Sequence, residues 1–124
     1  MKGAWNNKGV ALKELGKYKE ALGCYDKALS IDPGLVGAWL NKGAVFGKLG
    51  NYKEALGCYD KAVGINPKNV HAWFNKGVAL INLGRKPEET IGCFEQVIER
   101  ASPRDSALVE QAKRLIIELE TQNT

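Results

Sequence analysis

Apolar and small residues recur along the chain with the spacing of an amphipathic α-helix. Two successive segments each place three of them at i, i+4 and i+7, first Trp5, Gly9 and Leu12 and then Ala21, Tyr25 and Ala28. Gly16 stands between the segments, where a helix end favours a residue that tolerates positive φ. Pro33 follows the second segment, and proline cannot continue a helix. The pattern therefore predicts a helix, a turn and a second helix.

This helix–turn–helix pattern repeats with a period of 34 residues. Residues 1–34 and 35–68 are identical at 21 of 34 aligned positions, and tryptophan recurs at Trp5, Trp39 and Trp73. The third copy has one extra residue near 85–89. One helix pair cannot bury its apolar face alone, but three stacked pairs can. We therefore predict three repeats within one domain, at 1–34, 35–68 and 69–102.

The residues at fixed offsets in each copy resemble the tetratricopeptide repeat family. Two copies carry the full pattern, as Trp5, Gly9, Leu12, Gly16, Tyr18, Ala21, Tyr25, Ala28 and Pro33, and as Trp39, Gly43, Phe46, Gly50, Tyr52, Ala55, Tyr59, Ala62 and Pro67. The third copy keeps the first four positions, Trp73 to Gly84, and then departs, with Thr90 and Val97 where alanine is expected. The resemblance covers about residues 1–100. It implies an all-α, right-handed α-solenoid of three helix–turn–helix units.

The last segment, 103–124, does not repeat the motif. Its apolar residues share one helical face, at Leu108, Ala112, Leu115, Ile116 and Leu119. We predict a C-terminal helix that covers the apolar end of the solenoid. The alternative is that this helix docks in the groove of a neighbouring copy and makes the chain a self-associating structural module, a homo-oligomer. The first repeat starts almost at Met1, so the chain is also compatible with an excerpt of a longer array.

The charge pattern disfavours nucleic acid as a partner. The net charge is +4 and the pI is about 9.0, but the lysines alternate with acidic residues instead of forming a basic stripe. An RNA-binding solenoid is therefore only a third alternative. Where the family prefers leucine, the chain has Lys8, Lys42 and Lys76, whose stems we expect to lie on apolar surface with the ammonium in water. No apolar run is long enough to span a membrane, so we expect a cytoplasmic location.

Catalytic, cofactor and metal sites are not expected. The chain has one histidine, His71, and its glycines are repeat glycines rather than a phosphate-binding loop. Cys24, Cys58 and Cys93 occupy one repeat position. Equivalent atoms of stacked repeats lie about 10 Å apart, whereas a disulfide needs Cα atoms within about 7 Å. We therefore interpret the cysteines as small hydrophobic core residues.

The resemblance also implies a concave groove, lined by the first helix of each repeat, in which a peptide lies. The candidate groove residues are Asn7, Val10, Leu40, Asn41, Ala44, Lys48, His71, Phe74, Asn75, Val78 and Ile81. Among these, Asn7, Asn41 and Asn75 recur at one position, where an amide either pairs with a peptide backbone or bonds neighbouring repeats. Leu40, Phe74, Val78 and Ile81 form a predicted apolar partner patch.

One binding mode of the family is disfavoured by the residues present. Chaperone-binding members clamp a C-terminal carboxylate with two Lys, two Asn and an Arg, and the matching positions here are Asn6, Val10, Asn41, His71 and Asn75. Only Asn41 agrees with that set. We predict a non-enzymatic protein- or peptide-binding scaffold whose groove is apolar and rich in amides, with an extended or helical segment lying along it.

Overall fold

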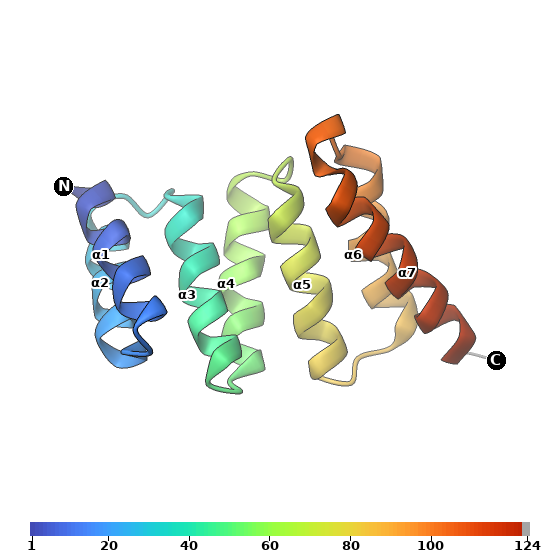
Figure 1. Cartoon of the computed structure of the whole chain (residues 1–124), viewed down its shortest axis with the longest axis horizontal. Coiled ribbons are helices and arrows are strands. Elements are labelled where there is room, and N and C mark those ends of the chain that lie inside the picture. Colours follow the sequence, from blue (N-terminus) through green and yellow to red (C-terminus); the bar gives the residue numbers. More distant parts are fainter. Residues whose placement is uncertain (123–124) are drawn as a thin grey trace.

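The computed structural model describes residues 1–122, which form helices joined in antiparallel pairs. The pairs are α1 (Lys2–Glu14) with α2 (Tyr18–Ile31), α3 (Val36–Lys48) with α4 (Tyr52–Ile65), and α5 (Val70–Asn82) with α6 (Pro87–Arg100). A short 3-10 turn, η1 (Pro103–Asp105), leads into α7 (Ser106–Gln122). The pairs stack side by side from α1 and α2 at one end to α7 at the other (Figure 1). The predicted all-α solenoid is confirmed.

Each helix pair turns at a glycine in the left-handed region. Gly16, Gly50 and Gly84 have φ of 79°, 79° and 69°. In the first turn the residue after the glycine, Lys17, donates its backbone N–H to the carbonyl of Leu12 at 2.8 Å. This bond satisfies a carbonyl that the last turn of α1 would otherwise leave unpaired. Glycine is favoured at these positions because a Cβ makes positive φ costly.

Within each pair, an aromatic ring lies directly on a glycine of the partner helix. A Cβ built on Gly43 would stand 2.5 Å from a ring carbon of Tyr59, and one on Gly9 would stand 2.5 Å from Tyr25. Phe94 packs on Gly77 in the third pair in the same way, with a corresponding distance of 2.7 Å. The two helices therefore approach closely only because these positions carry no side chain.

Neighbouring pairs are joined by a lysine held between a tryptophan and an aspartate. Lys42 Nζ lies 5.5 Å from the ring centroid of Trp39 and 2.8 Å from a carboxylate oxygen of Asp26 in the preceding pair. Lys76 repeats the arrangement, at 5.7 Å from the ring of Trp73 and 2.9 Å from Asp60. The expectation of an ammonium group left in water was incomplete for these two lysines, because the stacking of the pairs brings a carboxylate to each of them.

The hydroxyl of Tyr25 is buried and has no hydrogen-bond partner within residues 1–122. We expect Tyr25→Phe to raise the free energy of unfolding by about 1 kcal/mol, because it removes an unpaired buried polar group and Phe94 already fills the equivalent position. Burial also raises the pKa of Tyr25 to about 12. Since the folded-state pKa lies above the ordinary value of 10.0, the stability of the fold falls as the pH rises from 10 towards 12, because the unfolded chain ionises Tyr25 before the folded chain does. Urea unfolding at pH 7 and pH 11 measures both effects, and a variant no more stable than the parent at either pH would contradict them.

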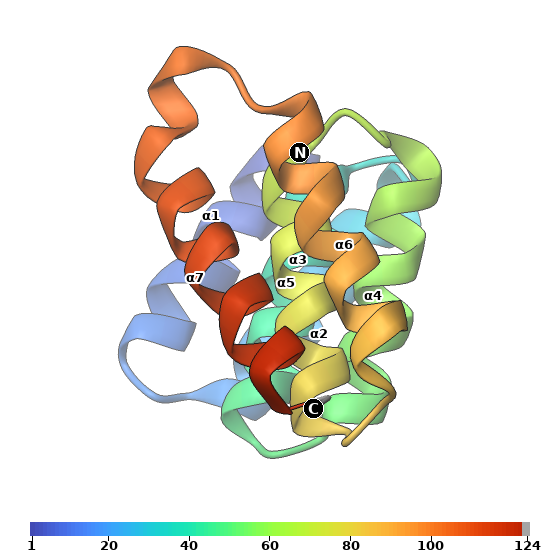
Figure 2. The same cartoon turned by 90° about the vertical axis from the view of Figure 1, so that its right-hand side faces the viewer.

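Helix α7 covers the last pair. The core at this end contains Val70, Phe94 and Val97 together with Ala112 and Leu119 of α7. Figure 2 shows α7 lying along α6 of the same chain. The turn into α7 is fixed by Asp105, whose carboxylate accepts hydrogen bonds from the backbone N–H of Ser102 at 2.9 Å and from its hydroxyl at 3.1 Å. These bonds hold the pKa of Asp105 below its usual value.

Candidate functional site

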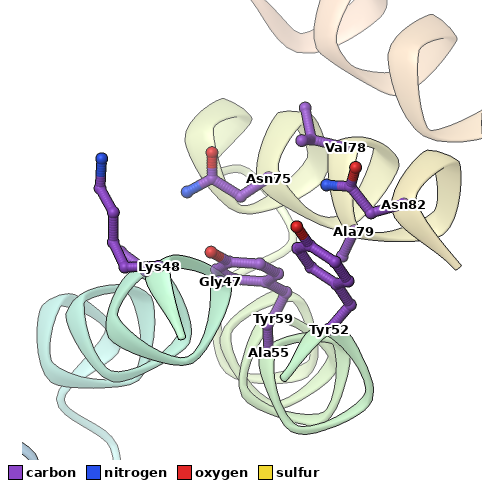
Figure 3. A pocket seen from close by; sticks show the side chains of 10 residues that line it. Gly47, Lys48, Tyr52, Ala55, Tyr59, Asn75, Val78, Ala79 and Asn82 are labelled. Atoms are coloured by element: carbon purple, nitrogen blue, oxygen red, sulfur yellow. The ribbon is translucent and has the colours of Figure 1, made fainter. Parts of the chain in front are cut away.

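A cavity of about 280 Å³ opens between α3, α4 and α5, where the second helix pair meets the third. The rings of Tyr52 and Tyr59 rise from α4 into the space between α3 and α5 (Figure 3). The lining residues are Ala44, Gly47, Lys48, Tyr52, Ala55, Tyr59, Asn75, Val78, Ala79 and Asn82.

This cavity exists because small residues replace large ones at this junction of the repeats. Tyr25, at the first junction, packs against Val45, whereas Tyr59 packs against the smaller Ala79. Gly47 stands where the third copy has Ile81, and a Cβ on Gly47 would meet no atom within 4 Å. As a result Tyr59 keeps 7% of its surface exposed while Tyr25 is fully buried.

The chemistry of the cavity suits an uncharged group. Its walls combine the apolar side chains of the alanines and Val78 with the hydroxyl of Tyr59 and the amides of Asn75 and Asn82. The hydroxyl of Tyr59 is neutral at pH 7 and is able to donate a hydrogen bond, and burial raises its pKa further, from 10.0 to about 12. Lys48 is the charged residue of the lining, and it is exposed. An apolar side chain fits the floor, and the amides are placed to bond a peptide backbone beside it.

The recurring asparagines have different surroundings. Asn41 is half-buried and donates its amide N–H to the side-chain oxygen of Asn6 at 3.1 Å, which links α3 to α1. Asn75 lines the cavity, because Leu40 and not an amide stands in the position that Asn6 occupies one repeat earlier. Asn7 is exposed and does not line the cavity. Repeat position alone therefore did not decide between a structural and a groove-facing amide.

The predicted apolar residues are also dispersed. Phe74 makes an edge-to-face contact with Phe94, with ring centroids 5.4 Å apart, and packs on the core that α7 covers. Leu40 packs against the cluster formed by Ala55, Tyr59 and Ala79. Ile81 is 37% exposed. Of the predicted site residues, those that line the cavity are Ala44, Lys48, Asn75 and Val78.

The remaining two predicted residues lie elsewhere. Val10 packs against Tyr25 and Val45 at the first junction of the repeats. His71 lines a separate, polar cavity of about 610 Å³, together with Arg104 and Asp105 from η1.

Sequence reasoning missed the contribution of the second helices. Three lining residues, Tyr52, Ala55 and Tyr59, come from α4, the second helix of its pair. They were missed because the predicted groove was assigned to the first helices alone. A signal was present in the sequence. Gly47 departs from both other copies, which carry Lys13 and Ile81 in its place, and such a loss of side-chain volume exposes the helix behind it.

The cysteines are buried free thiols of the core. Burial raises the pKa of Cys58 to about 11 and raises that of Cys93 as well, which keeps both thiols protonated at pH 7. Within residues 1–122, no group of three or more His, Cys, Asp or Glu side chains is arranged to hold a metal ion. None of the described helices is long and apolar enough to cross a membrane.

Solved structures share this architecture at low sequence identity. The type III secretion chaperone SycD of Yersinia enterocolitica, in complex with a peptide of the translocator YopD, superposes with a TM-score of 0.92 at 16% identity, covering 98% of this chain and 94% of that one. The TPR2B domain of yeast Sti1 in its Hsp70 complex superposes with a TM-score of 0.88 at 17% identity, covering 98% of this chain and 97% of that one. The first TPR domain of Spaghetti (RPAP3), bound to the HSP90 peptide SRMEEVD, superposes with a TM-score of 0.79 at 24% identity, covering 94% of this chain and 95% of that one.

Family models place the repeats in the sequence itself. A comparison with curated proteins gives no significant match. One tetratricopeptide repeat model matches residues 3–35 and 36–69, and a second matches residues 58–90. The two matches of the first model fall on the pairs α1–α2 and α3–α4 and span more than half of the chain, so the chain belongs to the tetratricopeptide repeat family.

Proposed function

We propose that the chain is a non-enzymatic scaffold that binds a segment of a partner protein along its groove. The cavity at Tyr59 takes one apolar side chain of that segment, and Asn75 and Asn82 bond the backbone beside it. The observation that carries this proposal is the opening of the cavity by Gly47 and Ala79 at one junction of the repeats. Its volume, about 280 Å³, lies at the lower edge of the range for small-molecule sites and suits a single side chain.

The structural relatives support a peptide as the ligand. SycD, Sti1 and Spaghetti (RPAP3) each carry a peptide or a chaperone partner in their complexes. This chain differs from a carboxylate clamp because Asn6, Val10 and His71 stand in clamp positions that require other residues. We therefore propose recognition through an internal apolar side chain and not through an acidic C-terminus.

Self-association is the weaker candidate. Helix α7 packs on α6 of its own chain and buries Ala112 and Leu119 there. The apolar face of α7 that carries Ala112 and Leu119 is therefore already occupied within its own chain. The groove function is therefore preferred.

The test fills the cavity without disturbing the fold. Peptides selected by display on the chain should bind Gly47→Ile at least tenfold more weakly, because the new side chain occupies the space of the ligand. The melting temperature should stay the same or rise, since a glycine inside a helix is replaced and its Cβ meets no atom within 4 Å.

The matched control is Gly23→Ile, the same change at an exposed position of α2 whose Cβ also meets nothing. Isothermal titration should show unchanged binding in this variant. Equal affinity of the selected peptides for Gly47→Ile and the parent would rule out the cavity as the binding site. Asn41 and Phe74 are poor choices for such tests, because one bonds Asn6 and the other packs on Phe94.

A further inference from the structure

The cavity of about 610 Å³ that His71 lines, called here the second cavity, carries a cluster of basic side chains. Lys68 and His71 line it from the start of α5 and the turn before it, and Arg104 lines it from η1. The acidic residue of its lining is Asp105, whose carboxylate already accepts two hydrogen bonds from Ser102. No ion pair of Lys68, His71 or Arg104 with a carboxylate is found within residues 1–122. The second cavity therefore offers basic groups to a ligand.

The basic side chains of the α4–α5 turn depart from the repeat. Three positions of this turn differ in charge or basicity from the turn one repeat earlier. The changes are Asn66 for Asp32, Lys68 for Gly34 and His71 for Gly37. Each change removes an acid or adds a base, although α3 stacks on the first pair without any of them. The cluster is therefore not a requirement of the stacking of repeats.

The backbone beneath these side chains is held by local hydrogen bonds. The side-chain oxygen of Asn66 accepts the N–H of Lys68 at 3.1 Å, and that of Asn69 accepts the N–H of Ala72 at 3.2 Å. On the facing wall, the capping bonds of η1 fix the backbone that carries Arg104. A ligand therefore has to order side chains but not the backbone, which lowers the entropic cost of binding.

The two cavities lie along one face of α5. His71, at the start of the helix, lines the second cavity. Further along, Asn75, Val78 and Asn82 line the cavity at Tyr59, and these residues follow His71 at i+4, i+7 and i+11. The rise from His71 to Val78 is about 10 Å along the helix, a distance that an extended peptide covers with about three residues. One bound segment is therefore long enough to reach both cavities.

We propose that the segment bound at Tyr59 places an anionic side chain, a carboxylate or a phosphate, between Lys68 and Arg104 in the second cavity. This anionic side chain stands about three residues from the apolar one. Ammonium and guanidinium groups pair with both anions through charge-assisted hydrogen bonds. The inference rests on the proposed function and adds to it the charge of the ligand and the spacing of its two determinants. The anion belongs to a side chain within the segment, so no free C-terminus is required.

The first experiment repeats the display selection on a variant of the full chain, Lys68→Gln with Arg104→Gln. Peptides selected on the parent should carry Asp or Glu about three residues from an apolar residue. Peptides selected on the variant should keep the apolar residue and lose the acid. The matched control, Lys61→Gln with Arg100→Gln, removes the same two charges at exposed positions that line neither cavity. Selection on the control should retain the acid.

The second experiment measures the preference for an anion with synthetic peptides whose two ends are acetylated and amidated. Isothermal titration compares glutamate, phosphoserine and glutamine at the selected position. The parent and the control should prefer glutamate over glutamine about fivefold, and the variant by less than about twofold. The preference should shrink as the salt concentration rises, because the basic groups are exposed. The tighter of the two anionic peptides identifies the anion.

The results separate this inference from the proposed function. Binding that is lost in Gly47→Ile but shows no preference for an anion would overturn the inference and leave the proposed function standing. Equal loss of the preference in Lys68→Gln/Arg104→Gln and in its control would also overturn it, since general charge would then explain the effect. Binding that needs Lys68 and Arg104 but tolerates Gly47→Ile would support the anion site and contradict the proposed function instead.

Discussion

Ala112→Asp is expected to lower the free energy of unfolding by about 3–5 kcal/mol. Ala112 lies on the face of α7 that packs on the third pair. It is fully buried there, in one cluster with Phe94 and Val97. An aspartate there would bury a carboxylate without a partner, or α7 would leave α6 and expose that core. Thermal and urea unfolding followed by circular dichroism measure the loss.

Ile117→Asp provides the matched control for α7. It introduces the same charge on the same helix, at a side chain that is 64% exposed. We expect its effect to stay within about 0.5 kcal/mol. Similar losses in the two variants would show that α7 responds to any added charge and does not cap the solenoid through the face that carries Ala112.

Gly43→Val is expected to lower the free energy of unfolding by about 1–3 kcal/mol. Its Cβ would stand 2.5 Å from a ring carbon of Tyr59, so either the ring or the whole of α3 must move. The higher helix propensity of valine offsets only about 0.4 kcal/mol of that cost. Chemical denaturation gives the difference directly.

Gly47→Val separates this effect from helix propensity. It is the same substitution one turn further along α3, at a position where a Cβ meets no atom within 4 Å. We expect its stability to equal or slightly exceed that of the parent. If both valines destabilise the chain equally, the close approach of α3 to Tyr59 is not what requires glycine at position 43.

The repeating pattern by itself determined the fold. The spacing of Trp5, Gly9 and Leu12 predicted a helix, and Gly16 predicted its end, which the structure confirms with a glycine of positive φ. Such features are local, because periodicity and turn chemistry act within one helix pair. The period of 34 residues then implied stacking, since a single pair leaves its apolar face uncovered.

The location of the candidate site needed contacts between repeats. The same offset holds Asn41, which bonds Asn6, and Asn75, which lines the cavity. The difference depends on a neighbour 35 residues away, Asn6 for Asn41 and Leu40 for Asn75, and periodicity does not report what that neighbour is. Gly47 was visible as a departure from the repeat, but that it exposes Tyr59 is known only once α3 and α4 are placed together.

The lysines and the end helix show the same division between sequence and tertiary structure. From the sequence, Lys8, Lys42 and Lys76 were equivalent, and Phe74 was a candidate for an exposed patch. Stacking gave two of the lysines an aspartate, and α7 brought Phe74 into a core with Phe94. The sequence determined which faces of each helix are apolar, because side-chain spacing along a helix is fixed by its geometry. Only the tertiary structure decided which of those faces are covered, because that depends on which helix each face meets.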